Sequence, residues 1–342
     1  MKQILVLLLA VWVLFSNAGI SAELASTVTK PTAETNAGEA TPAKAAPRTT
    51  TLTARFATLE EGQELMRGRE LFHEQINEES LAFLLQKKEG TLEEYIEYAA
   101  DQVLPFTPEE EQRVKDTLLW LQQSLEKHHL RLLDPGTITF VKSTGEEVSG
   151  ASGYTSGGTV FLSRTVFDIP SEEYLREIAV HEIFHCLSRL FPEFRQAMYS
   201  LIHFTVMDHE IDIPEDIQAG IIANPDVEHH NSYAAFTING QPENCYLICL
   251  TDTVFEEEGD SFFQDMYTGI VPLGGNTVYQ IEDVPDFWDI VGRNTDYTSD
   301  PEEIMAENFC YAMMNLDNGF DGFMTPVIPR GIVEYLSWQD PE

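Results

Sequence analysis

Five consecutive residues, His181-Glu182-Ile183-Phe184-His185, have the types and the spacing that metal-assisted hydrolysis requires. Residues four apart on an α-helix lie on one face, one turn apart, so the imidazoles of His181 and His185 can bind one Zn²⁺. Glu182 lies beside the metal on such a helix, where its carboxylate can accept a proton from the attacking water. The pattern therefore predicts a zinc site with Glu182 as general base.

The sequence around this motif indicates a buried helix. The neighbours of the two histidines are uncharged: Ile178, Ala179, Val180, Ile183, Phe184, Cys186 and Leu187. A solvated helix would carry charged side chains at several of these positions. Ser171 is a candidate N-cap, and Glu172 and Glu173 favour the first helical turn. We therefore expect a helix from about Glu172 to Leu190, ending before Pro192.

A catalytic zinc takes three protein ligands and leaves a fourth position for water, so the site needs a further acid or imidazole. Glu303 and Glu307 share one face of a predicted helix that begins at Pro301. One carboxylate can bind the metal while the other orients a ligating histidine. Because Glu303 also occupies the third helical position, both acids can instead serve only the helix terminus. Competing ligands precede this helix: His209, Glu210, His229 and His230.

The two motifs together, HExxH at 181–185 and Glu-x-x-Ala-Glu at 303–307, resemble the gluzincin class of zinc metallopeptidases, most closely its lethal-factor-like branch. The resemblance implies a zincin-like fold in which Glu303 binds zinc. It also implies that Glu307 supports the ligands without binding the metal, and that Tyr297 stabilises the oxyanion.

The rest of the sequence excludes one related class of zinc metallopeptidases and shows how far apart the two motifs lie. Metzincins are excluded, because Ser188 and Phe191 stand where their pattern requires glycine and histidine. The wider sequence is similar to a group of uncharacterised exported proteins. A long insertion separates the two motifs, and its polar stretch at 224–233 either lines the substrate cleft or forms a surface loop.

The N-terminus has the order of a secretory signal peptide: a lysine, an apolar run from Ile4 to Phe15, and small residues up to Ala22. The run is shorter than the roughly 20 residues of a membrane-spanning helix, so an uncleaved anchor is the lesser alternative. We expect residues 1–22 to be removed on export, which makes the mature chain secreted or periplasmic. Residues 23–51, rich in Ala, Thr and Pro, are expected to form a disordered linker.

The composition is strongly acidic, with 57 Asp and Glu against 20 Lys and Arg and a net charge of −37. Such a chain repels nucleic acid and anionic membranes, so neither is expected as a partner. Four cysteines are too few for a disulfide scaffold. We expect four buried free thiols, with a Cys186–Cys310 bridge as the alternative. The other two cysteines are Cys245 and Cys249.

The order of patterns predicts an α+β fold: a mainly helical segment at 52–135, then a zincin-like catalytic domain at 136–342 with a small sheet, an active-site helix and a ligand helix. Capping boxes at three threonines and apolar periodicity predict helices at about 59–76, 79–88, 92–103 and 108–128. Alternating patterns predict strands at 137–142, 159–163, 232–238 and 245–254. The Gly- and Ser-rich residues 150–158 indicate a connection.

These patterns lead to one functional expectation and one alternative. The first is an exported zinc-dependent peptidase that hydrolyses a peptide or protein substrate, with Zn²⁺ as cofactor. The alternative is a zinc-stabilised module that binds a peptide or cell-wall partner without catalysis. The intact Glu182 favours catalysis, because a module that only binds needs the histidines and not the base.

Overall fold

The computed structural model describes residues 47–261 and 266–337, and over these ranges the fold is α+β, as the sequence predicts. The predicted signal peptide at 1–22 and most of the predicted linker at 23–51 lie outside the described residues. The described helices and strands belong to one compact unit that begins at Pro47.

The last residues of the predicted linker are ordered, so that part of the prediction is wrong. Strand β1 (Arg48–Thr49) pairs with β4 (Leu132–Leu133) in an antiparallel ribbon. The guanidinium of Arg48 donates to the carbonyl of Tyr335 at 3.0 Å and lies over its ring at 4.9 Å from the centroid. These long-range contacts fix a segment whose composition alone indicates disorder.

The main sheet has the strand order β2-β5-β7-β6, with a short fifth strand beside β5. Its strands are β2 (Thr53–Phe56), β3 (Val103–Leu104), β5 (Thr137–Ser143), β6 (Gly153–Ser156) and β7 (Thr159–Ser163). β2, β5 and β7 are parallel, whereas β6 runs antiparallel to β7 and forms an edge of the sheet. The predicted connection at 150–158 therefore contains an edge strand, and that prediction is wrong.

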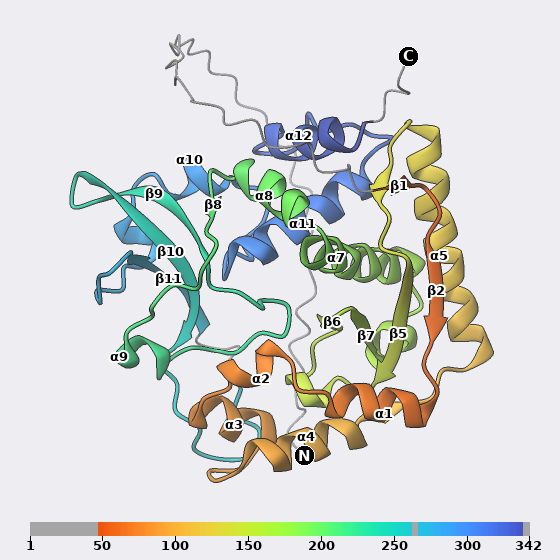
Figure 1. Cartoon of the computed structure of the whole chain (residues 1–342), viewed down its shortest axis with the longest axis horizontal. Helices are drawn as coiled ribbons and strands as arrows, with labels where there is room; N and C mark the ends of the chain where they lie inside the picture. The colour runs from red at the N-terminus through yellow and green to blue at the C-terminus, as the bar shows by residue number, and fades with distance from the viewer. Residues whose placement is uncertain (1–46, 262–265, 338–342) are drawn as a thin grey trace. The chain divides into compact units, whose positions relative to one another are not determined.

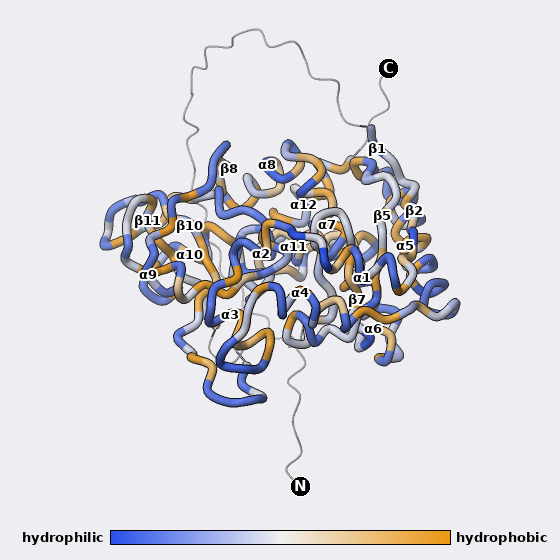
Figure 2. Tube along the Cα trace, turned by 60° about the horizontal axis from the view of Figure 1, so that its bottom comes forward, coloured by the Kyte–Doolittle hydropathy of each residue, from blue (hydrophilic) through white to orange (hydrophobic). Residues whose placement is uncertain are grey.

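The helices before this sheet are α1 (Leu59–Arg67), α2 (Leu71–Gln75), α3 (Glu78–Leu85), α4 (Leu92–Asp101) and α5 (Pro108–Lys127). The capping boxes of Thr58, Thr91 and Thr107 are confirmed. The single helix predicted at 59–76 is wrong, because the chain leaves the helix at Gly68, whose ψ of 134° is extended. Hydrophobic and hydrophilic residues alternate in short stretches along α1 and α4 (Figure 2), as amphipathic packing requires.

The predicted boundary at residue 135 is not a boundary of the fold. β2 comes from the predicted helical segment and pairs with β5 from the predicted catalytic segment. Both segments lie within the same compact unit. The helices α1 to α5 are therefore packed into one unit with the motif helix.

A second, antiparallel sheet lies within the insertion and has the order β11-β10-β9-β8. Its strands are β8 (Thr205–Val206), β9 (Ser232–Ile238), β10 (Gln241–Thr251) and β11 (Met266–Pro272). The strand predicted at 232–238 is confirmed, and the one predicted at 245–254 begins earlier and ends at Thr251. A short helix, α9 (Glu215–Gln218), lies between β8 and the hairpin formed by β9 and β10.

The motif helix is α7 (Glu172–Leu190), whose bounds agree with the prediction. The remaining α-helices are α6 (Arg164–Asp168), α8 (Pro192–Ser200), α10 (Phe287–Val291), α11 (Pro301–Met314) and α12 (Val327–Leu336). Among these, α6, α8 and α11 pack against α7. α7 packs against β6 and β7 on one side and against α11 on another (Figure 1). The ring of Phe184 lies 5.6 Å from those of both Phe194 and Phe309. This aromatic cluster fixes the motif helix against α8 and α11.

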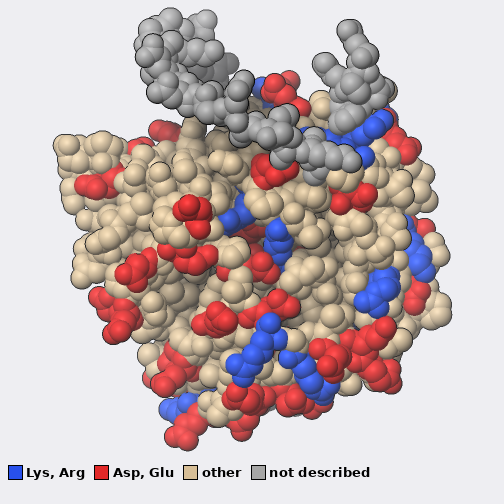
Figure 3. Space-filling view, viewed as in Figure 1, with Lys and Arg blue, Asp and Glu red and all other residues tan. Residues whose placement is uncertain are grey.

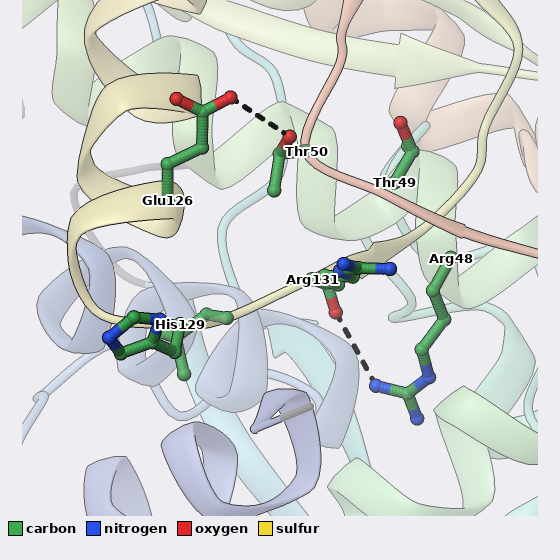
Figure 4. A pocket seen from close by; sticks show the side chains of 7 residues that line it. Arg48, Thr49, Thr50, Glu126, His129 and Arg131 are labelled. Carbon is green, nitrogen blue, oxygen red and sulfur yellow. Dashed lines mark hydrogen bonds between the residues drawn. The ribbon is translucent and has the colours of Figure 1, made fainter. Parts of the chain in front are cut away.

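The visible surface agrees with the acidic composition, since Asp and Glu outnumber Lys and Arg on the face in Figure 3. A polar hollow beside β1 is lined by Arg48, Thr49, Thr50, Glu126, His129, Leu130 and Arg131 (Figure 4). It shares no residue with either zinc motif. Among the described helices, none combines the length and the apolar character that a membrane crossing requires.

Candidate metal centre

Three residues predicted as zinc ligands come together where α7 meets α11. Ligand atoms of His181, His185 and Glu303 all lie within 4.8 Å of one another. Oε2 of Glu303 lies 3.1 Å from Nε2 of His181 and 3.7 Å from Nε2 of His185. The side chains of His181, His185 and Glu303 are 13%, 0% and 1% exposed. This is a compact His/His/Glu donor set of the kind that binds zinc.

A second carboxylate orients each histidine. Nδ1 of His181 lies 3.2 Å from Oε1 of Glu307, and Nδ1 of His185 lies 3.1 Å from Oε1 of Glu302. A histidine that donates through Nδ1 keeps the lone pair of Nε2 for a metal. Nε2 of His185 is buried and has no hydrogen-bond partner among the described residues. An orphaned buried nitrogen aimed at Glu303 fits a metal site, because such an atom is otherwise costly.

Glu302 is a site residue that the sequence analysis missed. Its Oε2 accepts hydrogen bonds from the hydroxyls of Ser188 at 2.8 Å and Tyr199 at 2.6 Å. Arg195 lies 3.6 Å from the same oxygen. Burial favours the neutral acid, but the bond to His185 and the charge of Arg195 outweigh it and lower the pKa of Glu302. Glu302 is therefore a charged acceptor that fixes His185.

Glu303 is held in its charged form by the same surroundings. Burial opposes its ionisation, yet the hydrogen bond from His181 and the charge of His185 lower its pKa to about 2. In turn, burial would lower the pKa of His181, but the bonds to Glu303 and Glu307 raise it well above its usual value. The buried acid and the imidazole thus shift each other's pKa in opposite directions, because each stabilises the charged form of the other.

Glu182, the predicted general base, is buried beside the candidate ligands and only 2% exposed. The hydroxyl of Thr155, on the edge strand β6, donates to its Oε2 at 2.8 Å. Burial raises the pKa of Glu182 and outweighs the attraction of His181 and His185. A raised pKa is the direction that a carboxylate base working near neutral pH needs.

The polar stretch at 224–233 contributes two side chains to the site. The amide of Asn224 donates to Oε1 of Glu303 at 2.5 Å. Oδ1 of Asp226 lies 3.8 Å from Nε2 of His185, and Asp226 forms a second potential metal group with Glu182 and His185. Burial and the charge of Glu182 raise the pKa of Asp226 to about 8. The surface-loop interpretation is therefore wrong for the beginning of this stretch.

The competing ligands proposed from the sequence belong to neither metal group found in the described residues. His209 is exposed and lies 2.7 Å from Asp208, whereas Glu210 lies 2.6 Å from Nδ1 of His229 at the surface. His230 is more enclosed, and its burial lowers its pKa to about 4. Its nearest acid in an ion pair is Asp300, at 3.9 Å.

Tyr297 lies at the site as the resemblance implies. Its hydroxyl donates to Oε1 of Glu303 at 3.1 Å, on the same oxygen as Asn224. Burial, followed by the charge of Glu303, raises the pKa of Tyr297 well above its usual value. The phenol is therefore a neutral donor beside the ligand set.

The four cysteines are free thiols, so the alternative of a Cys186–Cys310 bridge is wrong. Cys186, Cys245 and Cys310 are buried, and Cys249 is only partly so. Burial raises the pKa of the Cys186 thiol to about 12. None of the four belongs to the metal groups found in the described residues.

The charges around the candidate ligands fit a divalent cation. Besides Glu303, four carboxylates surround the two histidines: Glu182, Asp226, Glu302 and Glu307. Two guanidinium groups, those of Arg189 and Arg195, ion-pair with nearby acids at 3.1 and 3.6 Å. Buried carboxylates in excess of buried cations are stabilised when a metal binds among them.

No protein family, curated protein or solved structure matches this chain. The resemblance to gluzincins therefore depends on the two short motifs alone. One lies on α7 and the other on α11, and these are the helices that bring the candidate ligands together.

Proposed function

We propose that this chain is an exported zinc-dependent peptidase with a zincin-like catalytic domain. The observation that carries the proposal is the meeting of α7 and α11, where His181, His185 and Glu303 offer donor atoms within 4.8 Å of one another. Glu182 lies buried beside them. Export to the periplasm or the medium is proposed from the signal-peptide pattern at 1–22.

The proposed ligands of zinc are His181, His185 and Glu303, and the bound metal would supply a Lewis acid that polarises the scissile carbonyl and acidifies water. Glu182 accepts the proton of the attacking water and then donates it to the leaving amine. The Thr155 hydroxyl holds the Glu182 carboxylate in place by its 2.8 Å hydrogen bond. Positioned bases of this kind contribute roughly 10²–10⁴-fold to a rate.

The experiment that tests this function replaces Glu182 by Gln, which keeps the shape and cannot act as the base. Zinc content should stay at the wild-type level, and cleavage of an unfolded protein should fall by about 10²–10⁴-fold. The matched control is Glu173→Gln on the exposed start of α7, which should leave cleavage unchanged. A wild type that holds zinc and cleaves nothing, with chelator and zinc-restoration controls, contradicts the proposal.

Burial of the site favours one alternative function, a zinc-stabilised module that binds a partner without catalysis. Asp226 is close enough to His185 to complete a closed four-ligand site, as structural zinc has. In that case Asp226→Ala should lower zinc affinity strongly, and removing zinc should lower the unfolding temperature. A peptidase predicts instead that zinc remains bound in Asp226→Ala, because three ligands are left.

A further inference from the structure

The proposed active site is closed to a peptide in the described structure. Exposed fractions are 0% for His185, 1% for Glu303, 2% for Glu182 and 7% for Asp226. A polypeptide substrate needs several residues of extended chain to pass the reacting atoms, so a site this buried has to open before it can act. The segment that covers the site is the loop containing Asn224 and Asp226, which contacts both the proposed ligands and the edge strand β6.

Asp226 occupies a position that an extended substrate would need. Its Oδ1 accepts the main-chain N–H of Thr155 at 2.7 Å. Thr155 lies on β6, an edge strand, and its N–H points away from β7. Edge strands bind extended peptides by donating such N–H groups to the peptide carbonyls. The Asp226 carboxylate thus stands where the carbonyl of a bound peptide would accept this hydrogen bond.

The same loop also lies against the ligand set. Asn224 donates to Glu303, and Oδ1 of Asp226 lies 3.8 Å from Nε2 of His185. Asn224 further accepts the N–H of Asp226 at 2.9 Å, which makes the two residues one tight turn. One short turn therefore covers both the edge strand and the proposed metal ligands.

Arg189, one turn after the HExxH motif on α7, anchors this turn. Its guanidinium donates to the carbonyl of Pro225 at 2.7 Å and to that of Gly157 at 3.3 Å, and it pairs with Glu228 at 3.1 Å. Gly157 belongs to the turn between β6 and β7. The side chain of Arg189 is 10% exposed, so its bonds are shielded from water.

A second anchor comes from the N-terminal helices. The amide of Gln75, at the end of α2, donates to the carbonyls of Val227 at 3.1 Å and Glu228 at 3.2 Å. Arg189 and Gln75 thus hold the loop from two elements that are distant in the sequence. In the contacts given for the described residues, Arg189 and Gln75 form no hydrogen bond or ion pair with the three candidate ligands.

From this geometry we propose that residues 224–228 form a latch in which Asp226 is a built-in competitor of the peptide substrate. The latch rests on the proposed peptidase function and adds its regulation: the chain folds into a closed form, and cleavage requires the loop to leave β6. Arg189 and Gln75 set the fraction of open molecules. Since the apparent affinity for substrate falls with that fraction, weakening either anchor increases cleavage.

The test uses full-length mature protein loaded with zinc and three single variants: Arg189→Ala, Gln75→Ala and Asp226→Ala. The matched control is Arg176→Ala, on the same helix α7, whose guanidinium lies over Trp120 at 4.9 Å and away from the loop. Two readouts are measured for each protein. One is amide hydrogen exchange over residues 153–156, and the other is kcat/KM on fluorescently labelled casein.

Each latch variant should exchange faster than wild type over 153–156 and show kcat/KM raised about tenfold or more, with zinc content unchanged. Arg176→Ala should match wild type in both readouts. If Arg189→Ala does not fold, Gln75→Ala still decides the question, because it removes only a half-buried surface anchor.

Three results overturn the latch, and they differ in what they say about the peptidase. Unchanged exchange in every variant shows that the loop is not held by these anchors. Faster exchange with kcat/KM equal to or below that of an active wild type shows that Asp226 does not compete with substrate, and it leaves the peptidase proposal intact. Faster exchange with no cleavage by any protein, wild type included, overturns both proposals together.

Discussion

Nδ1 of His185 lies 3.1 Å from Oε1 of Glu302, and this contact leaves Nε2 of the same ring directed at Glu303. Glu302 and Glu303 are adjacent on α11, yet Glu302 contacts Nδ1 of His185 on α7 and Glu303 lies on the side of its Nε2. His181 is held in the same way between Glu303 and Glu307. Three acids of a single helix thus fix the orientation of both histidines.

The first prediction concerns which acid binds the metal. Glu303→Ala should weaken zinc binding far more than Glu307→Ala, because it leaves only two protein ligands. Loss of the supporting Glu307 should cost roughly 10–100-fold in affinity. Zinc affinity is measured by competition with a chromophoric chelator, with His209→Ala as a control at an exposed histidine. A larger effect of Glu307→Ala would exchange the two roles.

The second prediction concerns Glu302, which orients His185. Glu302→Ala should lower zinc affinity by about 10–100-fold, since His185 loses its Nδ1 acceptor. Glu302→Gln keeps an acceptor oxygen and should recover part of the loss. The same competition assay applies, and Glu334→Ala on the exposed face of α12 is the control. If Gln and Ala lower the affinity equally, the charge matters and the hydrogen bond to His185 does not.

Local signals account for the part of the site that the sequence predicts. The predicted N-cap Ser171 is confirmed, and so are the predicted helices α7 and α11, the second of which is capped by Asp300. Helix spacing then determines which side chains share a face. Helix spacing therefore pairs His181 with His185 and Glu303 with Glu307, whereas the choice of Glu303 as the third candidate ligand depends on the resemblance to gluzincins.

Contacts between distant segments account for the part that the sequence analysis missed. Thr155 lies in a Gly- and Ser-rich stretch whose composition predicts a loop. Residues 153–156 of this stretch form a strand because they pair with β7. Asn224 and Asp226 reach the site from within the insertion, at a point that no periodic pattern indicates. From the sequence, Glu302 is interpreted as an acid that stabilises the first turn of its helix. Its hydrogen bond with His185 forms only because α7 packs against α11.

The third prediction concerns the pH dependence of stability and uses Glu147, which is remote in sequence from the zinc motifs and 0% exposed. Burial raises its pKa above 4.5 despite hydrogen bonds from Ser143 and Tyr154. The folded protein therefore keeps this proton to a higher pH than the unfolded chain does. Stability from this group is present below about pH 4.5 and is lost as the pH rises through the raised folded pKa, by up to about 1.4 kcal/mol per pH unit.

Glu147→Gln removes this titration, so the variant should be more stable than wild type at pH 8, and the difference should shrink towards pH 4.5. The free energy of unfolding is measured by urea denaturation at several pH values. Glu146→Gln, at the exposed neighbouring position, is the control. The measured quantity is the free energy of unfolding of Glu147→Gln minus that of wild type. If this difference is smaller at pH 8 than at pH 5, the sign of the prediction is contradicted.

The last prediction separates two roles of Tyr297, whose hydroxyl donates to Oε1 of Glu303 at 3.1 Å. If the phenol turns to the oxyanion during the reaction, Tyr297→Phe should lower kcat by about 10²–10³-fold while zinc affinity changes little. If it only positions Glu303, zinc affinity should fall and kcat of the zinc-loaded enzyme should stay near wild type. Tyr279→Phe, whose hydroxyl meets only Asn239 in the described contacts, is the matched control. We expect the first result, because burial keeps the phenol neutral and therefore able to donate a hydrogen bond to the oxyanion.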